Sequence, residues 1–478
     1  MRARIFAEEN RKWWTLGAVA FGLFMIMLDN TIVNVALPSI QRDLGIGISE
    51  LEWVVNGYAL TFAVLMLTGG KLADLLGRRL VFIVGLAIFS GASLACGLAL
   101  SAGFLIGARV VQGAGAALMN PATLSIITAT FPPRQRGMAI GIWAGVSALA
   151  LAIGPLLGGV ITQHISWGWI FFINVPVGIL AIVVARLVIQ ESRDTSAEQR
   201  LDLPGLLTSA IGLFALTYAL IEANSYGWTS ARILSLFAAT VIGLALFVAL
   251  ELRQRIPMLD LSLFRNATFA GANAVMLLVA LAMFGVFFFV SLYMQNILGY
   301  SAVQAGAAFL PMTLIIILAA PIAGKTSDRL GSRWLMTGGM LLVATQLLYF
   351  SQLGIGASFW DLLPGLVVGG LGMSMTMTPA TAAATRAVPV YKAGVGSAVL
   401  NAARQVGGSL GVALMGAIMA HSIGGRQLAG SFEPHAFIDG FERALLVAAG
   451  IAFVGAFVAA SLVRSHHERA PRPVPEVG

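Results

Sequence analysis

The sequence predicts an all-α polytopic membrane protein, and three observations carry that prediction. Of its 478 residues, 58% are hydrophobic and 10% are charged, with a mean hydropathy of +0.88. Long apolar runs recur along the chain, each about as long as a helix must be to cross a bilayer. Lys and Arg gather in short clusters between these runs. This composition excludes a soluble globular protein and a disordered chain, and the clustered charge argues against a nucleic-acid partner.

Taken in order, the apolar runs predict fourteen transmembrane helices. The first eight lie at 13–37, 51–69, 80–100, 104–127, 138–163, 168–190, 205–222 and 231–251. The other six lie at 268–294, 302–324, 334–352, 360–384, 396–420 and 442–463. The first run is too long for a signal peptide and lacks a small-residue cleavage site, so we expect it to remain as the first span.

The distribution of basic residues predicts the orientation. With the N-terminus in the cytoplasm, 24 of the 29 Lys and Arg fall in inner segments, among them Arg404, 4 fall in outer segments and Arg109 falls within a span. One missed helix would exchange the inner and outer assignments of all later segments and remove this asymmetry. We therefore expect a protein of the cytoplasmic (inner) membrane with both termini in the cytoplasm. The single cysteine, Cys96, excludes an intrachain disulfide.

An internal repeat predicts two related halves. The segment Gly70–Arg79 (GKLADLLGRR) matches Gly324–Arg333 (GKTSDRLGSR) at six of ten positions. The tripeptide Pro-Ala-Thr likewise recurs at 121–123 and 379–381. We therefore expect a duplicated six-helix bundle with two extra helices inserted between the copies. The predicted parts are an N-terminal bundle at 1–190, a linker with the inserted helices at 191–265, and a C-terminal bundle with a cytoplasmic tail at 266–478.

The first apolar run carries an acid, Asp29, within the stretch Leu28–Pro38 (LDNTIVNVALP). A charge inside the bilayer costs at least ~2.5 kcal/mol by insertion scales, so such an acid is by default a candidate functional group. Arg109 lies within a span at a similar estimated depth, and the two side chains are expected to face one cavity. A buried guanidinium needs a partner, so the structural alternatives are an Asp29 that pairs with a neighbour and an Arg109 that bonds to backbone carbonyls.

Other titratable residues are weaker candidates. Glu222, Glu52 and Asp361 lie near predicted outer helix ends, where acids are more often interfacial than coupled to transport; Glu222 is retained as a minor proton-coupling candidate. The five histidines form no pattern of metal ligands or of a catalytic triad. No metal site and no cofactor are therefore expected.

A cluster of charge and glycine follows the second predicted span. Gly70 and Gly77 permit a tight turn and close helix contact, and Asp74 lies among basic residues that include Arg78 and Arg79. Such a cluster can hold neighbouring helices together on the cytoplasmic side through ion pairs. The alternative is that the basic residues only set the topology.

Four motifs together resemble those of the major facilitator superfamily, and within it the fourteen-helix branch of drug:proton antiporters. They are LDNTIVNVALP, GKLADLLGRR, LIGARVVQGAGAA at 105–117, and GPLLGG, whose Gly154, Pro155, Gly158 and Gly159 match the motif associated with exporters. The resemblance covers nearly the whole chain. It implies two bundles that rock about a central cavity, and a loop motif that latches the outward-facing state.

The function that the resemblance implies is a proton-coupled antiporter that exports amphipathic drugs or toxic compounds by alternating access. Its partners would be small substrates, protons and the lipid bilayer, with the proton gradient as the driving force. We expect a monomer, and recruitment of a periplasmic adaptor stays open. The rival interpretations are an exporter of lipids or of one endogenous metabolite, and a polytopic membrane enzyme. An enzyme is disfavoured because the intramembrane charges do not form a catalytic cluster.

Polar, aromatic and methionine side chains in several spans are candidates to line the substrate cavity, although packing or lipid-facing roles are the alternative for most of them. They are Asn34, Gln112, Met119, Asn120, Phe284, Phe288, Tyr293 and Met377.

Overall fold

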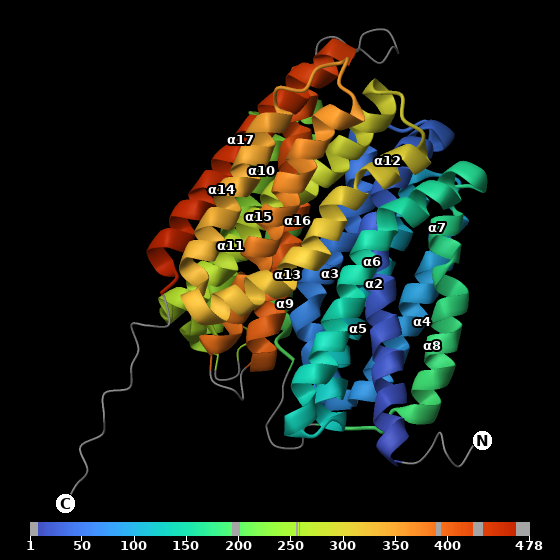
Figure 1. Ribbon diagram of the computed structural model, residues 1–478, viewed down its shortest axis with the longest axis vertical. Coiled ribbons are helices and arrows are strands. Elements are labelled where there is room, and N and C mark those ends of the chain that lie inside the picture. Colours follow the sequence, from blue (N-terminus) through green and yellow to red (C-terminus); the bar gives the residue numbers. More distant parts are fainter. Residues whose placement is uncertain are drawn as a thin grey trace, which may run out of the picture.

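The computed structural model describes residues 8–193, 201–254, 257, 259–388, 393–423 and 434–464 (Figure 1). Within these residues the chain forms helices joined by turns, with no β-strand. Part of the predicted linker, at 194–200, and the cytoplasmic tail, at 465–478, lie outside the described residues. The prediction of an all-α chain is confirmed for the described part.

Each predicted span falls on a helix. The N-terminal elements are α2 (Glu8–Leu44), α3 (Ile48–Leu76), α4 (Arg78–Gly97), α5 (Ala102–Thr130), α6 (Pro133–His164), α7 (Trp169–Phe172) and α8 (Asn174–Val188). They are followed by α9 (Leu203–Tyr226), α10 (Ala231–Arg253) and the short 3₁₀ helix η1 (Leu261–Arg265). The C-terminal elements are α11 (Ala267–Leu292), the π-helical turn η2 (Tyr293–Ile297), α12 (Ala302–Ala308), α13 (Leu310–Leu330), α14 (Ser332–Phe350), α15 (Phe359–Arg386), α16 (Ala393–Ile423) and α17 (Pro434–Leu462).

The helices have the length and composition of a multi-pass membrane protein. In the described part of the chain, eleven of them are long and apolar enough to span a bilayer. The predicted spans on α6, α14 and α16 fall outside that set. The number fourteen therefore stays a prediction.

The helices pack as two bundles with a pair of helices against the seam between them. In Figure 1 the blue to teal elements α2–α8 lie on one side and the yellow to red elements α11–α17 on the other. The two groups meet through contacts of α3 with α16, α6 with α12 and α2 with α11. Helices α9 and α10 pack on each other, and α9 also contacts both α3 and α16. Thus α9 touches both bundles.

Glycines of α6 allow close backbone contact with α2 in the same bundle and with α12 of the opposite bundle. Gly158 lies against the backbone of Ile32 in α2, and Gly159 lies against the backbone of Ala302 in α12, so that a methyl group at either glycine would overlap the partner. Since side chains are missing from both faces, α6 fits tightly between α2 and α12. Gly158 of GPLLGG thus acts in packing within the N-terminal bundle, and Gly159 acts at the contact between bundles.

Hydrogen bonds join the bundles toward one end of the molecule, the upper end in Figure 1. Ser291 Oγ donates to the carbonyl of Asn34 and Gln295 Nε2 donates to the carbonyl of Val35, both at 2.9 Å. Further bonds connect α16 with α3 and α12 with α6 in the same half. Between the residues that the structure describes, the hydrogen bonds across the two bundles all lie toward this end, which the predicted topology places outside the cell.

The junction between α3 and α4 requires glycine. Gly77 has φ of 121°, in a region that side chains rarely adopt, and its repeat counterpart Gly331 has φ of 85°. The equivalent junctions of the two halves therefore turn in a similar way. A methyl group at residue 77 would also overlap the carboxyl group of Glu191.

We therefore predict that Gly77→Ala lowers the free energy of unfolding by about 1–2 kcal/mol, the cost of a left-handed backbone for a residue with a Cβ. Thermal unfolding in detergent measures this change. Gly17→Ala is the matched control, because Gly17 has open space around it within α2 and alanine favours helix. Equal melting temperatures for the two variants would contradict the assigned strain at Gly77.

Candidate functional site

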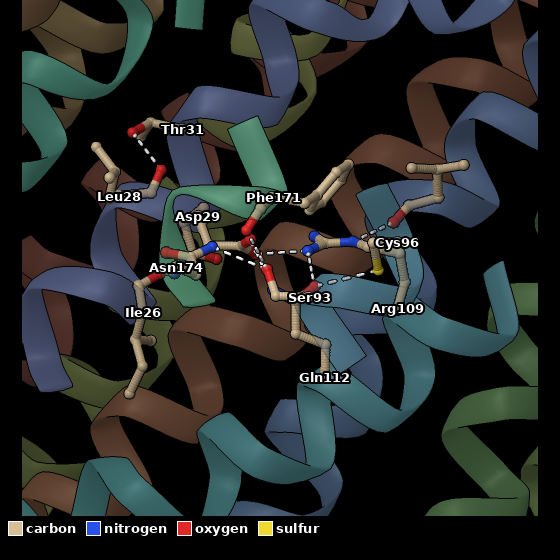
Figure 2. Close-up of polar contacts among 12 residues, drawn as sticks. Ile26, Leu28, Asp29, Thr31, Ser93, Cys96, Arg109, Gln112, Phe171 and Asn174 are labelled. Atoms are coloured by element: carbon tan, nitrogen blue, oxygen red, sulfur yellow. Dashed lines mark hydrogen bonds and ion pairs between the residues drawn. The ribbon is translucent and has the colours of Figure 1, made fainter. Parts of the chain in front are cut away.

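An ion pair lies inside the N-terminal bundle. Asp29 on α2 is 0% exposed and Arg109 on α5 is 1% exposed. The guanidinium Nη1 lies 2.5 Å from Asp29 Oδ2 (Figure 2). The two intramembrane charges that the sequence placed at similar depth are therefore direct partners.

Three further contacts hold the guanidinium of Arg109. Its Nε donates to the carbonyl of Val54 at 3.0 Å, and its Nη1 donates to Gln112 Oε1 at 2.7 Å. The ring of Tyr58 lies 4.2 Å from the guanidinium carbon, which adds a cation–π interaction. Arg109 therefore bonds both to an acid and to a backbone carbonyl, so the two alternatives weighed from the sequence occur together.

A polar network continues from this pair toward α4 and α8. Gln112 Nε2 donates to Asp29 Oδ1 at 2.9 Å and to Ser93 Oγ at 3.3 Å. Ser93 Oγ donates to the carbonyl of Phe171 at 2.9 Å and accepts a bond from Asn174 Nδ2 at 3.0 Å (Figure 2). The sequence reasoning missed Ser93 and Asn174, although each is a polar residue within an apolar run.

This network is enclosed by protein. Asp29, Ser93 and Gln112 are 0% exposed and Asn174 is 2% exposed. The expectation that Asp29 and Arg109 face an open cavity therefore does not describe this conformation. In a buried pair, removal of one charge leaves the other uncompensated, at a cost of about 3–5 kcal/mol. Loss of either charge would therefore weaken the contact between α2 and α5.

The loop motif is arranged within the N-terminal bundle. Asp74 Oδ1 accepts bonds from Nε and Nη2 of Arg78, at 3.1 and 2.9 Å, within the turn that joins α3 to α4. Nearby, Gly70 lies close to Pro121 of α5. The predicted ion pair is present, and it links residues of one turn rather than two bundles.

A residue outside the predicted motif completes this cluster. Glu191, just after α8, accepts hydrogen bonds from the backbone N–H groups of Arg79 and Leu80 at 3.0 and 3.2 Å. The Arg79 guanidinium also donates to the carbonyl of Ile189 at 3.3 Å. The carboxylate thus sits at the N-terminus of α4, where the helix dipole favours negative charge. This arrangement fastens the end of α8 to the start of α4.

The structure corrects the placement of Glu52 and gives the depth of Arg404 in its helix. Glu52, expected at the membrane interface, is 2% exposed and enclosed in protein. Arg404, counted with an inner segment, lies about three turns inside α16 and interacts electrostatically with Tyr58. Glu222 is half-buried on α9.

The candidate cavity residues lie in different surroundings. Tyr293 is packed within the C-terminal bundle, where its hydroxyl donates to the carbonyl of Gly354 at 2.6 Å and its ring stacks on Phe441 at 5.2 Å. The side chains of Gln112, Met119, Asn120 and Phe288 are also buried, whereas Asn34, Phe284 and Met377 are partly exposed. Which of these residues meet a substrate stays a prediction. In the part of the chain that was searched, no group of His, Cys, Asp and Glu could hold a metal ion.

Sequence comparisons relate the chain to exporters. The profile of the Major Facilitator Superfamily matches residues 19–412 and 272–478. The tetracenomycin C resistance and export protein of Streptomyces glaucescens is 39% identical over 421 residues, which cover 87% of this chain and 77% of that protein. The puromycin resistance protein pur8 of Streptomyces alboniger is 37% identical and covers 97% of this chain and 93% of its own length. The multidrug resistance protein Stp of Mycobacterium tuberculosis is 37% identical over 88% of this chain and 77% of that protein.

Solved structures match over almost the whole chain. A bacterial homologue of the human lysosomal transporter Spinster, crystallised in an inward-facing and unoccupied conformation, superposes with a TM-score of 0.70 at 18% identity and covers 97% of this chain and 99% of that chain. A peptide transporter, POT, reaches a TM-score of 0.67 at 14% identity over 93% of each chain. At these identities the likeness concerns the fold. Together with the family profile and the relatives at more than one third identity, it shows that this chain is a transport protein, not an enzyme, and belongs to the Major Facilitator Superfamily.

Proposed function

We propose that this protein is a proton-coupled antiporter that exports amphipathic, antibiotic-like compounds across the cytoplasmic membrane, in the fourteen-helix branch of drug:proton antiporters. The names of the relatives, which refer to resistance against tetracenomycin C, puromycin and several drugs, support the substrate class. The buried Asp29–Arg109 pair carries the proposal of proton coupling. A carboxylate enclosed in a membrane domain and neutralised by one arginine is a group whose charge state can be exchanged during a cycle.

Alternating access relates the Asp29–Arg109 pair to one conformational state of the transport cycle. The bonds between the bundles lie toward the predicted outer end, so we assign this conformation to the state that opens toward the cytoplasm. In that state Asp29 is bound to Arg109 as an ionised partner, which corresponds to a transporter that has released its proton inward. In the state that opens outward, Asp29 takes up a proton from outside.

Protonation acts through α2 in this proposal. A neutral Asp29 gives up its charge interaction with Arg109, while Arg109 keeps its bonds to Gln112 and to the carbonyl of Val54. Residues 34 and 35 follow about one and a half turns later on α2, and their carbonyls hold α11 and η2. A shift of α2 that follows protonation therefore reaches the contact between bundles directly. Because Asp29 is enclosed, substrate and proton compete through this movement rather than at one open site.

We predict that Asp29→Asn abolishes uphill, pH-driven transport, because asparagine cannot titrate. The variant should still insert and fold, since asparagine keeps the shape and hydrogen-bonding capacity, although the uncompensated charge of Arg109 lowers its stability. Puromycin uptake into inverted proteoliposomes with an imposed pH gradient measures this effect. Glu442→Gln is the control, since Glu442 is an exposed acid on α17. If Asp29→Asn accumulates puromycin uphill with the wild-type pH dependence, Asp29 is a structural acid and proton coupling must depend on another group.

The proposed topology predicts opposite accessibility at the two ends of the molecule. A cysteine at Arg193, exposed after α8, should react with a membrane-impermeant thiol reagent from the cytoplasmic side alone. A cysteine at His435, exposed at the start of α17, should react from the outer side alone. The native Cys96 is buried, so the unmodified protein provides the blank. Labelling of both positions from the same side would refute the fourteen-helix topology.

A further inference from the structure

A second buried acid lies at the seam between the two bundles. Glu52, just inside the predicted outer end of α3, is 2% exposed, and its Oε2 atom has no hydrogen-bond partner among the described residues. Across the seam it faces Gly416 of α16, where a methyl group would overlap the Glu52 carboxyl. The carboxyl group thus fills the space that a glycine leaves on the opposite bundle.

The charged groups around Glu52 do not neutralise it. Helix α9 presents Glu222, a like charge that interacts electrostatically with Glu52. On α5, Arg109 is bound to Asp29 and to a backbone carbonyl. On α16, Arg404 lies about 18 Å along the helix from Gly416. The ion pairs of the described residues do not include Glu52 or Glu222.

This environment accommodates the neutral acid. Burial of an ionised carboxylate without a counter-charge is far more costly than burial of the protonated group. The closed seam therefore selects the form of Glu52 that carries a proton. When α3 and α16 separate at the outer end, water reaches the carboxyl group and removes this preference.

Neighbouring contacts place Glu52 within a polar seam between three parts of the chain. Ser409 Oγ of α16 donates to Asn56 Oδ1 of α3 at 2.9 Å, one turn from Glu52. Asn224 Nδ2 of the inserted helix α9 donates to the carbonyl of Ala417 at 2.7 Å. The inserted helix therefore contributes both a bond to the C-terminal bundle and the second acid.

We propose that Glu52, with Glu222 beside it, is a proton-binding site of the outer gate, and that α3, α9 and α16 close only after Glu52 has taken up a proton from the outer side. This inference rests on the alternating access of the proposed function. The proton returns to the outer side when the gate reopens, so it is not carried across the membrane. The site is thus distinct from Asp29. Because the closed outer gate holds the proton, a low pH outside favours the return to the inward-facing state.

The sign of the pH dependence follows from linkage. The closed gate binds the proton more tightly than the open gate, so a lower outer pH favours closure and a higher pH favours opening. For one proton, the ratio of open to closed molecules changes by up to about tenfold per pH unit. This change is confined to the pH range in which the closed gate binds the proton and the open gate does not.

The test measures the opening of the outer gate without substrate. Spin labels on cysteines at Arg42 and Ile355, both exposed at the outer end, report the distance between the bundles at several pH values. In the otherwise unmodified chain we expect the open population to rise with pH. Glu52→Gln should keep the gate predominantly closed at every pH. Glu50→Gln, an exposed acid two residues away, should keep the unmodified response.

Two further variants separate this proposal from the proposed function. Asp29→Asn, which tests transport coupling, should remove any contribution of Asp29 to the pH response of the outer gate and retain the contribution of Glu52. Gly416→Ala should open the gate at lower pH, because its methyl group overlaps the closed position of the Glu52 carboxyl. The proposal is wrong if Glu52→Gln retains the unmodified pH response, or if Gly416→Ala leaves it unshifted. Either outcome would leave the Asp29 transport result unaffected.

Discussion

The ion pair between Asp29 and Arg109 is the constraint on which the rest of the N-terminal bundle depends. A charge pair with almost no exposure is tolerated only when each lone pair and each N–H finds a partner. Gln112, Tyr58 and the carbonyl of Val54 supply those partners from two helices. The pair is sensitive to the loss of either charge, because the remaining charge would be buried without its partner.

The stretch of α2 that follows Asp29 connects this pair to the contact between bundles. Thr31 and Ile32 lie against glycines of α6, and the carbonyls of Asn34 and Val35 accept bonds from the C-terminal bundle. Within two turns of one helix, the chain thus combines a titratable group, a close helix contact and a link to the opposite half. The C-terminal half lacks this arrangement, because the repeat places Val367 where the first half has Arg109.

Much of the fold and part of the site could be predicted from the sequence. Apolar runs located the helices because bilayer-length hydrophobicity is a local property of the chain. Asp29 and Arg109 stood out because charge within such runs is rare. The role of Glu191 could not be read from the loop motif, since its partners Arg79 and Leu80 lie more than one hundred residues away.

The burial of Glu52, an acid near a helix end, could not be predicted from the sequence either. Glu52 is the fifth residue of α3, and such a position near a helix end predicts a place at the membrane–water interface. Glu52 is buried only because α16 and α9 pack over it. Exposure at a seam depends on the partner helix, so an acid of this kind looks ordinary in the sequence. Ser93 and Asn174 escaped notice for a related reason, because a single hydroxyl or amide in an apolar run acquires a role only through the neighbours that bond to it.

The central claim, that Asp29 alternates between an ionised partner of Arg109 and a protonated acid, can be tested by infrared difference spectroscopy of the reconstituted protein before and after addition of puromycin at fixed pH. The account predicts loss of a carbonyl band of a protonated carboxylic acid as the drug binds, with that band absent in Asp29→Asn and retained in Glu52→Gln. An unchanged band in Asp29→Asn, or no change of any carboxyl band on drug binding, would contradict the account.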